Sequence, residues 1–361
     1  MATIHHIPPE HLERIAYEIF KAAGSPEHEA RLIAQQLLLS NLGGHDSHGV
    51  IRVSTYMGWL REGKIRPGAK NTFLRDDGST ALMDGNWGYG QTAMQQTADV
   101  AIERARKHGI SAVGVTRLMH IGRLADYALA GARAGMVSLV GTTAGGAGAT
   151  VAPFGGIARR IATNPFAAGF PSSGARGPVW FDMATSTVAE GKVQVARDAH
   201  KELAPGILLD KHGKPSTNPV DLYEGGAILP TGGTHGYKGY LMAFMVEVLA
   251  GLLTGGGFVG KDKDPRFDNC TFMICIDVAR FRDLGDFTRE LDELIDYLKA
   301  TPSRPGEEVL YPGEVEKRME AERRRTGIPL AEETVTKIQA ELDHFKIPIR
   351  LAAEATAPMA R

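Results

Sequence analysis

Hydrophobic residues recur at helical spacing through the first 60 or so residues of the chain. The stretch PPEHLERIAYEIFKAAG opens on proline and closes on glycine, as helices commonly do. SPEHEARLIAQQLLLSNLGG repeats this arrangement, with Ser25 as the expected cap and Pro26 at the first helical position. A third helix is predicted from near Ser47 to about Glu62. The pattern therefore predicts an N-terminal helical part over residues 1–70.

From about residue 70 the hydrophobic pattern changes, and short runs of small or β-branched residues alternate with helical segments. The expected strands are TALMDG, ISAVGVT, MVSLVGTT, VWFDMAT and CTFMICIDV. The expected helices between them are GQTAMQQTADVAIERARKHG and GRLADYALAGARAG. Residues 71–285 are therefore predicted to form an α/β domain.

Two further segments complete the predicted organisation. GYLMAFMVEVLAGLLTGGG is interrupted by Glu247 and Gly251, so it is expected to be a buried helix, because a bilayer span needs about 20 largely apolar residues. Residues 286–350 are again helical and charged, and they are predicted to pack with the N-terminal helices. Residues 351–361 carry no pattern and are expected to form a tail.

Composition narrows the classes of protein that this chain could belong to. It has 361 residues, 43% of them hydrophobic, and a formal net charge of −1, which gives no electrostatic footprint for nucleic acid or an anionic membrane. Only two cysteines occur, Cys270 and Cys275, which fits a reducing compartment and provides no disulfide framework. The N-terminus lacks the pattern of a secretory signal, so a cytoplasmic location is expected.

The segment GYGQTA, residues 88–93, has the order of a dinucleotide-binding fingerprint between a strand and a helix. The next strand, however, is followed by RLMH, with no acidic residue to bind a ribose. We therefore interpret GYGQTA as a tight entry into an amphipathic helix and predict that it does not bind a cofactor pyrophosphate.

The segment HDSH, residues 45–48, places titratable groups where two predicted helices meet. His45 and His48 are three residues apart, as zinc ligands often are, but no third ligand lies nearby at a telling spacing. Asp46 or Ser47 could instead accept hydrogen bonds at the helix start. Capping does not account for His48, so a third hypothesis is needed.

That hypothesis uses the predicted third helix, on which His48, Arg52 and Tyr56 would line one face. An arginine fork grips a carboxylate through two hydrogen bonds, and an imidazole exchanges a proton near neutral pH. This face suits a small anionic substrate; the alternative is an exposed polar helix face.

The stretch GHDSHGVIR resembles the signature of the malate/L-lactate dehydrogenase family, and its wording is nearest to the hydroxycarboxylate dehydrogenases within it. Similar stretches follow in the same order: HIGRLADYA, ATNPFAAGFP, FDMATSTVAEGK, GYKGYLMAFMVEVLAGLLTGG and YPGE. The resemblance implies an oxidoreductase of 2-oxo and 2-hydroxy acids that uses NAD or NADP. It also implies an α/β domain with a mixed, non-Rossmann sheet, flanked by a helical part from both chain ends, in a homodimer.

The resemblance also implies roles for particular residues, in a site without a metal. His48 matches the catalytic proton donor, and Asp182 matches an active-site aspartate beside the nicotinamide. Arg52 is added from spacing, as the anchor for the substrate carboxylate. The residues expected to hold the cofactor are His48, His120, Gly122, Arg123, Leu124, Pro178, Val179, Trp180, Phe181, Asp182, Met183, Ala184, Thr185, Tyr237, Lys238, Asn269, Gly313, Glu314, Val315 and Glu316.

One stretch departs from the sequence that is usual in the family. Many members read HKGYG or WKG where this chain has HGYKGYL, so His235 precedes Lys238 by two positions more than expected. Plainer explanations also exist for three of the residues: Asp182 could merely end a strand, Lys238 could be a solvated helix-start lysine, and His120 could be a core histidine.

The chemistry of these residues fits the implied reaction. Reduction of a carbonyl places negative charge on its oxygen, which His48 can protonate. Asp182 is expected to fix the tautomer of that imidazole, while the positive end of a helix opposes its protonation, so a pKa near neutrality is expected. Two alternatives stay open: a reductase of cyclic imino acids, and an inactive homologue that only binds.

Overall fold

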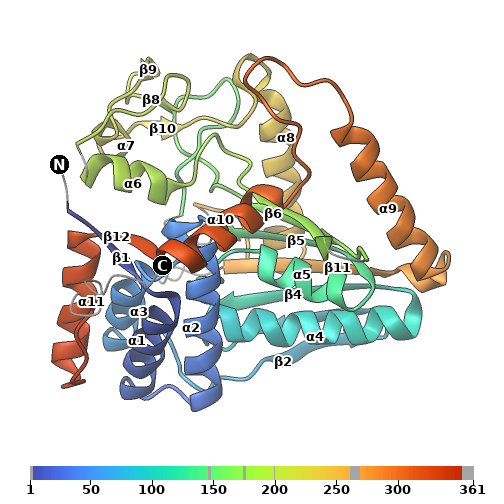
Figure 1. Ribbon diagram of the computed structural model, residues 1–361, viewed down its shortest axis with the longest axis horizontal. Helices are drawn as coiled ribbons and strands as arrows, with labels where there is room; N and C mark the ends of the chain where they lie inside the picture. The colour runs from blue at the N-terminus through green and yellow to red at the C-terminus, as the bar shows by residue number, and fades with distance from the viewer. Residues whose placement is uncertain (1–2, 145–147, 174–175, 199, 261–268, 352–361) are drawn as a thin grey trace.

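The computed structural model describes residues 3–144, 148–173, 176–198, 200–260 and 269–351 (Figure 1). At its centre lies a seven-stranded sheet in the order β2–β3–β4–β11–β5–β6–β7. Only β3 and β4 pair in parallel among these strands, so the sheet is mixed, as the sequence predicted. The strands are β2 (Thr72–Asp77), β3 (Thr80–Asp84), β4 (Ile110–Leu118), β5 (Met136–Ala144), β6 (Phe166–Phe170), β7 (Val179–Met183) and β11 (Asn269–Asp277).

Helices pack on both faces of this sheet. Alternate residues of a strand point to opposite faces, and β11 shows the division. Met273 and Cys275 belong to the core beneath α4 (Gly90–His108) and α5 (Ala125–Arg133). Phe272 packs on the other face, against α8 (Tyr237–Val246) and the π-helical segment Glu247–Leu252 that continues it.

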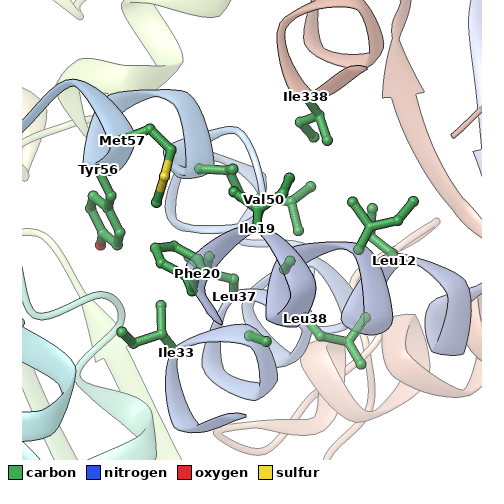
Figure 2. Packing of buried hydrophobic residues seen from close by; sticks show 14 of the residues in the cluster. Leu12, Ile19, Phe20, Ile33, Leu37, Leu38, Val50, Tyr56, Met57 and Ile338 are labelled. Carbon is green, nitrogen blue, oxygen red and sulfur yellow. The ribbon is translucent and has the colours of Figure 1, made fainter. Parts of the chain in front are cut away.

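The helical part joins both ends of the chain. β1 (Ile4–Ile7) pairs antiparallel with β12 (Ile328–Ala331). One hydrophobic core, part of which Figure 2 shows, is built from α1 (Pro9–Ala22), α2 (Glu27–Leu42), α3 (Arg52–Arg61) and α11 (Glu332–His344). α10 (Glu314–Thr326) packs against α2, whereas α9 (Leu284–Lys299) lies at the opposite end of the molecule (Figure 1).

A smaller unit lies above the sheet in Figure 1 and joins it through the segments around residues 186 and 230. A three-stranded antiparallel sheet, in the order β10–β8–β9, forms its centre. Val151, Val193, Leu208, Leu222 and Ile228 form its core. Its elements are α6 (Glu190–Asp198), β8 (Leu208–Leu209), β9 (Pro215–Ser216), α7 (Val220–Tyr223) and β10 (Ala227–Ile228).

Three local expectations were wrong. The third helix begins at Arg52, because the residues before it form a 3₁₀ turn, Asp46–His48, that ends at an extended Gly49. The Ser25 hydroxyl does not cap a helix; it hydrogen-bonds the Tyr89 hydroxyl at 2.7 Å. Leu351, expected in the tail, is buried, while residues 352–361 lie outside the described residues.

The expectation of a buried helix at α8 was also wrong. Four side chains of α8 and the segment after it are more than half exposed: Leu241 (58%), Phe244 (57%), Leu252 (52%) and Leu253 (70%). Only one side of this helix packs on the sheet, so an almost wholly apolar sequence leaves an apolar face uncovered. In the described part of the chain, no helix is both long enough and apolar enough to cross a membrane.

Candidate active site

A cavity of about 420 Å³ lies where the three parts of the fold meet. The helical part contributes His48 and Arg52, and the loop after β4 contributes His120. Glu190 and Tyr223 of the smaller unit also line the cavity. The other described residues of its wall are Trp59, Ile121, Gly122, Leu124, Thr142, Ala144, Gly148, Ala149, Thr150, Arg159, Ala162, Thr163, Asn164, Pro165, Ala189, Gly191, Leu222 and Asn269.

Tertiary contacts, rather than a helix, hold the turn that carries His48. Asp46 accepts hydrogen bonds from both Nη atoms of Arg323 on α10, at 2.6 and 2.9 Å, and from Asn41 Nδ2 at 2.6 Å. Asn41 Oδ1 in turn accepts from the Val50 N–H at 2.8 Å. A side chain at position 49 would collide with Asn41, since a Cβ there would lie 2.2 Å from Oδ1. Asp46 therefore anchors this turn and caps no helix.

Neither alternative for HDSH describes the turn in the structure. The Ser47 hydroxyl lies 2.9 Å from Nδ1 of His48 and makes no capping hydrogen bond. Among the described residues, no group of three or more histidine, cysteine, aspartate or glutamate side chains could hold a metal ion.

The His48 ring is held in a strongly electropositive place. It stacks on the His120 ring with centroids 5.3 Å apart. Burial, followed by the charges of Arg52, His45, Arg123 and Lys192, lowers the pKa of His48 to about 3. Burial and these charges disfavour a cationic ring, in contrast to the expected pKa near neutrality, and among the described residues no carboxylate hydrogen-bonds the ring.

His120 is fixed from behind by the helical core. The Tyr56 hydroxyl, which accepts from Gln91 Nε2 at 2.8 Å, lies 2.7 Å from His120 Nδ1. The Gly122 N–H also points to Nδ1, at 3.4 Å, so Nδ1 is the acceptor and the ring proton lies on Nε2. Burial and the charge of Arg52 lower the pKa of His120, which keeps the ring neutral. Its place on the cavity wall distinguishes it from a core histidine.

Arg52 opens α3 and reaches the same cavity, although it does not share a helix with His48. Its Nε donates to the Ser47 carbonyl at 2.7 Å, which fixes the guanidinium beside the turn. No carboxylate pairs with this guanidinium anywhere in residues 3–351 that the structure describes. The side chain is thus available to bind an anion beside His48.

Asp182 lies on β7 and acts on a helix instead of on His48. Its Oδ2 accepts from the N–H groups of Leu124 and Ala125, at 2.7 and 3.0 Å, at the start of α5. Burial raises the pKa of Asp182, while His45 and these two N–H groups oppose that shift. The described contacts include none between Asp182 and the His48 ring, so the tautomer partner that the sequence suggested is replaced by Ser47. Asp182 fixes the loop that carries His120.

The remaining residues expected to hold the cofactor divide into three groups. Gly122, Leu124 and Asn269 line the cavity with His120. Asn269 ties that wall together, accepting from the Ile121 N–H at 3.2 Å and donating to the Thr143 carbonyl at 3.1 Å. The second group lies on or beside β7, or in the loop after β4, and is not among the residues that line the cavity: Arg123, Pro178, Val179, Trp180, Phe181, Asp182, Met183, Ala184 and Thr185.

The third group is not brought to this cavity. Tyr237 and Lys238 are exposed at the start of α8. Gly313, Glu314, Val315 and Glu316 lie at the start of α10. Burial raises the pKa of Glu314, but hydrogen bonds from Lys299, the Tyr311 N–H and Arg318 outweigh it and bring the value to about 2.

Sequence reasoning missed several cavity residues, of which Asn164 is the most constrained. Its φ of 36° is unusual for a residue other than glycine. Its Nδ2 donates to the Ala243 carbonyl at 2.9 Å and to Glu247 Oε2 at 2.7 Å, which leaves the buried Oδ1 without a partner. Strained backbone often marks functional sites, but this strain is visible only in the structure and the stretch TNPF does not reveal it.

The glycines of GYGQTA have a structural explanation. A Cβ on Gly90 would lie 2.1 Å from the Met119 carbonyl oxygen and 2.3 Å from that of His120. Helix α4 therefore begins in direct contact with the backbone of the cavity loop. That this segment binds no pyrophosphate stays a prediction.

Comparisons with known proteins agree with this geometry. Residues 7–339 match the family described as malate/L-lactate dehydrogenase. The chain is 34% identical over 336 residues to hydroxycarboxylate dehydrogenase B of Escherichia coli K12, covering 91% of each chain. It is 36% identical over 346 residues to L-sulfolactate dehydrogenase of Methanothermobacter thermautotrophicus, covering 93% of this chain and 97% of that one.

Solved structures show the same likeness over almost the whole chain. Malate dehydrogenase from Entamoeba histolytica has a TM-score of 0.91 at 29% identity, covering 96% of this chain and 99% of that one. Δ1-piperideine-2-carboxylate reductase from Pseudomonas syringae has a TM-score of 0.80 at 26% identity, covering 93% and 99%. The chain belongs to the malate/L-lactate dehydrogenase family and is a 2-hydroxyacid dehydrogenase that uses a nicotinamide dinucleotide.

Proposed function

We propose that this chain reduces the carbonyl of a small 2-oxo acid, with His48 as the proton donor and Arg52 as the anchor for the carboxylate. One observation carries the proposal: Arg52, which pairs with no carboxylate among the described residues, shares one cavity wall with His48, whose lowered pKa favours the neutral ring. In the reverse direction the same residues would bind a 2-hydroxy acid and accept its proton.

The cavity also suits the nicotinamide end of the cofactor, whether NAD or NADP. Asn164 Oδ1 and Thr150 Oγ1 are buried, have no hydrogen-bond partner among the described residues and belong to residues of the cavity wall. A carboxamide both donates and accepts, so an acceptor and a hydroxyl on one wall are a matching pair. We propose that these two residues hold the carboxamide, and that His120, Gly122, Leu124 and Asn269 hold the ring beside His48.

Substrate binding would itself prepare His48 to act. The charge of Arg52 is one of the causes that lower the pKa of His48. A carboxylate bound to Arg52 offsets that charge, so substrate binding should raise the pKa of His48 and favour the protonated ring. His48 then protonates the carbonyl oxygen as negative charge develops there. The cofactor supplies the hydride for reduction and accepts it in the reverse direction.

A second reaction of the same kind is favoured by one comparison. The similarity to the Pseudomonas syringae piperideine-2-carboxylate reductase makes a cyclic imino acid a candidate substrate. Such a molecule also carries a carboxylate for Arg52 and a polar double bond beside it, so the roles proposed for both residues would hold.

We further propose that the chain forms a homodimer in the cytoplasm. Leu241, Phe244, Leu252 and Leu253 present an exposed apolar face along α8, as a surface covered by a second copy would. Lys238 opens the same helix, so a dimer could bring it to a cavity. Both cysteines are buried and free, which suits a reducing compartment.

Initial rates test the proposed reaction. Pyruvate, oxaloacetate, phenylpyruvate and Δ1-piperideine-2-carboxylate would each be mixed with NADH and with NADPH, and nicotinamide absorbance would be followed. Turnover of at least one 2-oxo acid, faster than that of the imine, is expected. Turnover of the imine alone would show that the site reduces C=N bonds instead. No turnover of any of the four substrates would contradict the proposal.

A further inference from the structure

A second arginine lines the same cavity as Arg52. Arg159 lies in the loop that returns the chain from Val151 to Ile161, two residues joined by an antiparallel bridge. Its neighbour Arg160 is exposed, and the Arg160 Nη1 donates to the Arg159 carbonyl at 2.9 Å. Two adjacent arginines thus differ in position: Arg159 lines the cavity, and Arg160 does not.

The Arg159 guanidinium carries no anionic partner among the described residues. Glu190 is the one carboxylate among the described residues of the cavity wall. It accepts a hydrogen bond from the Tyr223 hydroxyl at 2.8 Å and forms no ion pair with Arg159. The cavity wall therefore includes two arginines that form no ion pair among the described residues and one carboxylate that is already hydrogen-bonded.

Two arginines on one cavity wall are electrostatically unfavourable unless an anion enters the cavity. Like charges around a partly desolvated cavity repel one another, and an arginine removed from water is stabilised by a hydrogen-bonded anion. One carboxylate on Arg52 would leave Arg159 unmatched. A substrate with an anionic group at each end would match both.

We propose that Arg159 binds a second anionic group of the substrate, so that the preferred substrate is a dianionic 2-oxo acid. This inference rests on the function proposed above, in which Arg52 binds the carboxylate next to the carbonyl. Arg159 then determines specificity: it acts on the far end of the substrate and takes no part in proton transfer. A fork of two charge-assisted hydrogen bonds would give a discrimination of about 10-fold or more.

Two substrates of matched size test this inference. Oxaloacetate carries the second carboxylate, and its 4-amide, 2-oxosuccinamate, replaces that group with an uncharged one. Arg159→Gln should lower kcat/KM for oxaloacetate by about 10-fold or more and leave 2-oxosuccinamate within about 3-fold. Arg159→Lys, which keeps the charge, should fall between these values. Arg160→Gln is the matched control and should leave both substrates within about 2-fold.

The dissociation constants of NADH and NADPH, from nicotinamide fluorescence, complete the test. They should be unchanged in Arg159→Gln. A weaker cofactor together with equal losses for both substrates would overturn the inference and assign Arg159 to a cofactor phosphate. A wild-type enzyme that reduces 2-oxosuccinamate as well as oxaloacetate would also overturn it, yet would leave the proposed function standing. A protein that reduces neither of these two but does reduce pyruvate or phenylpyruvate would overturn the inference alone, and a protein that reduces none of these 2-oxo acids would contradict both.

Discussion

Two regions that the resemblance assigns to one active site differ sharply in how they are built. The wall formed by the 45–52 segment and the loop after β4 is tied together by hydrogen bonds and faces a cavity. The start of α8, with Tyr237 and Lys238, is exposed and continues into an uncovered apolar face. The difference teaches that one chain by itself assembles the wall that carries His48 and His120, whereas it leaves the apolar face beside α8 uncovered.

The packing explains why the first wall is well determined. Val50 and Tyr56 lie next to His48 and Arg52 in the chain and belong to the helical core (Figure 2). Arg323, from the far end of the chain, clamps Asp46, and Asp182 clamps the His120 loop. Around α8, by contrast, apolar side chains point outward and no polar contact fixes Lys238 among the described residues.

The largest effect is expected from removing the proton donor. His48→Ala should lower turnover of a 2-oxo acid by about 10²–10⁴-fold, the usual contribution of a positioned general acid. The cofactor dissociation constant should change much less, because the rest of the wall is intact. Steady-state rates and nicotinamide fluorescence measure the two quantities, and turnover within a factor of about three of wild type would remove His48 from this role.

A smaller effect is expected from changing the anchor. Arg52→Lys keeps the charge but loses the two-pronged geometry, so kcat/KM for a 2-oxo acid should drop by about 10-fold or more. The corresponding 2-oxo amide, which lacks the charge, should lose much less, and cofactor affinity should barely move. Equal losses for acid and amide, with weaker cofactor binding, would instead assign Arg52 to the nucleotide or to the fold.

Weakening the contact between Arg323 and Asp46 should have a smaller effect on turnover. Arg323→Lys replaces the fork on Asp46 by a single contact, so the turn shifts slightly and kcat should fall by roughly 3–10-fold, with KM less affected. Arg324→Lys is the matched control, since Arg324 pairs with Glu320 on the surface. If both variants keep wild-type kcat, the Asp46 contact does not position His48.

The smallest effect on turnover is expected from a change on the exposed apolar face along α8. Leu253→Asp places a charge on the apolar face, so light scattering should show a dimer becoming a monomer. Turnover at saturating cofactor should stay within about 3-fold, while KM for the cofactor should rise. A monomer that has lost all turnover would show that the proton-transfer wall is not complete in one chain.

The sequence predicted that His48 and Arg52 lie close together, but it did so for a partly wrong reason. His48 and Arg52 do line one cavity, but the expected helix face between them does not exist. The hydrogen bond that shapes the turn joins Asp46 to Arg323, 277 residues further along the chain. The spacing of residues near Asp46 could therefore not indicate it. Strands with clear hydrophobic runs were predicted well, while β2, whose six residues are all exposed, gave no signal.

Other parts of the site could not be predicted for different physical reasons. Arg159 looks like any surface arginine until the fold brings its loop to the cavity. The sequence of α8 predicts a buried helix because it is almost wholly apolar, yet only one side of the helix packs on the sheet, and the sequence pattern does not indicate that the other side is exposed.

The most direct test of the central claim is the pKa of the His48 ring, measured by nitrogen-15 NMR titration. The signal is assigned by its loss in His48→Gln. In the free protein the ring should stay neutral down to about pH 3, because burial and Arg52 both disfavour the charge. Oxamate, an unreactive 2-oxo acid analogue, should raise that pKa in the wild type and fail to do so in Arg52→Gln, whose free pKa is already higher. A free pKa near 6.5 that oxamate does not change would contradict the account.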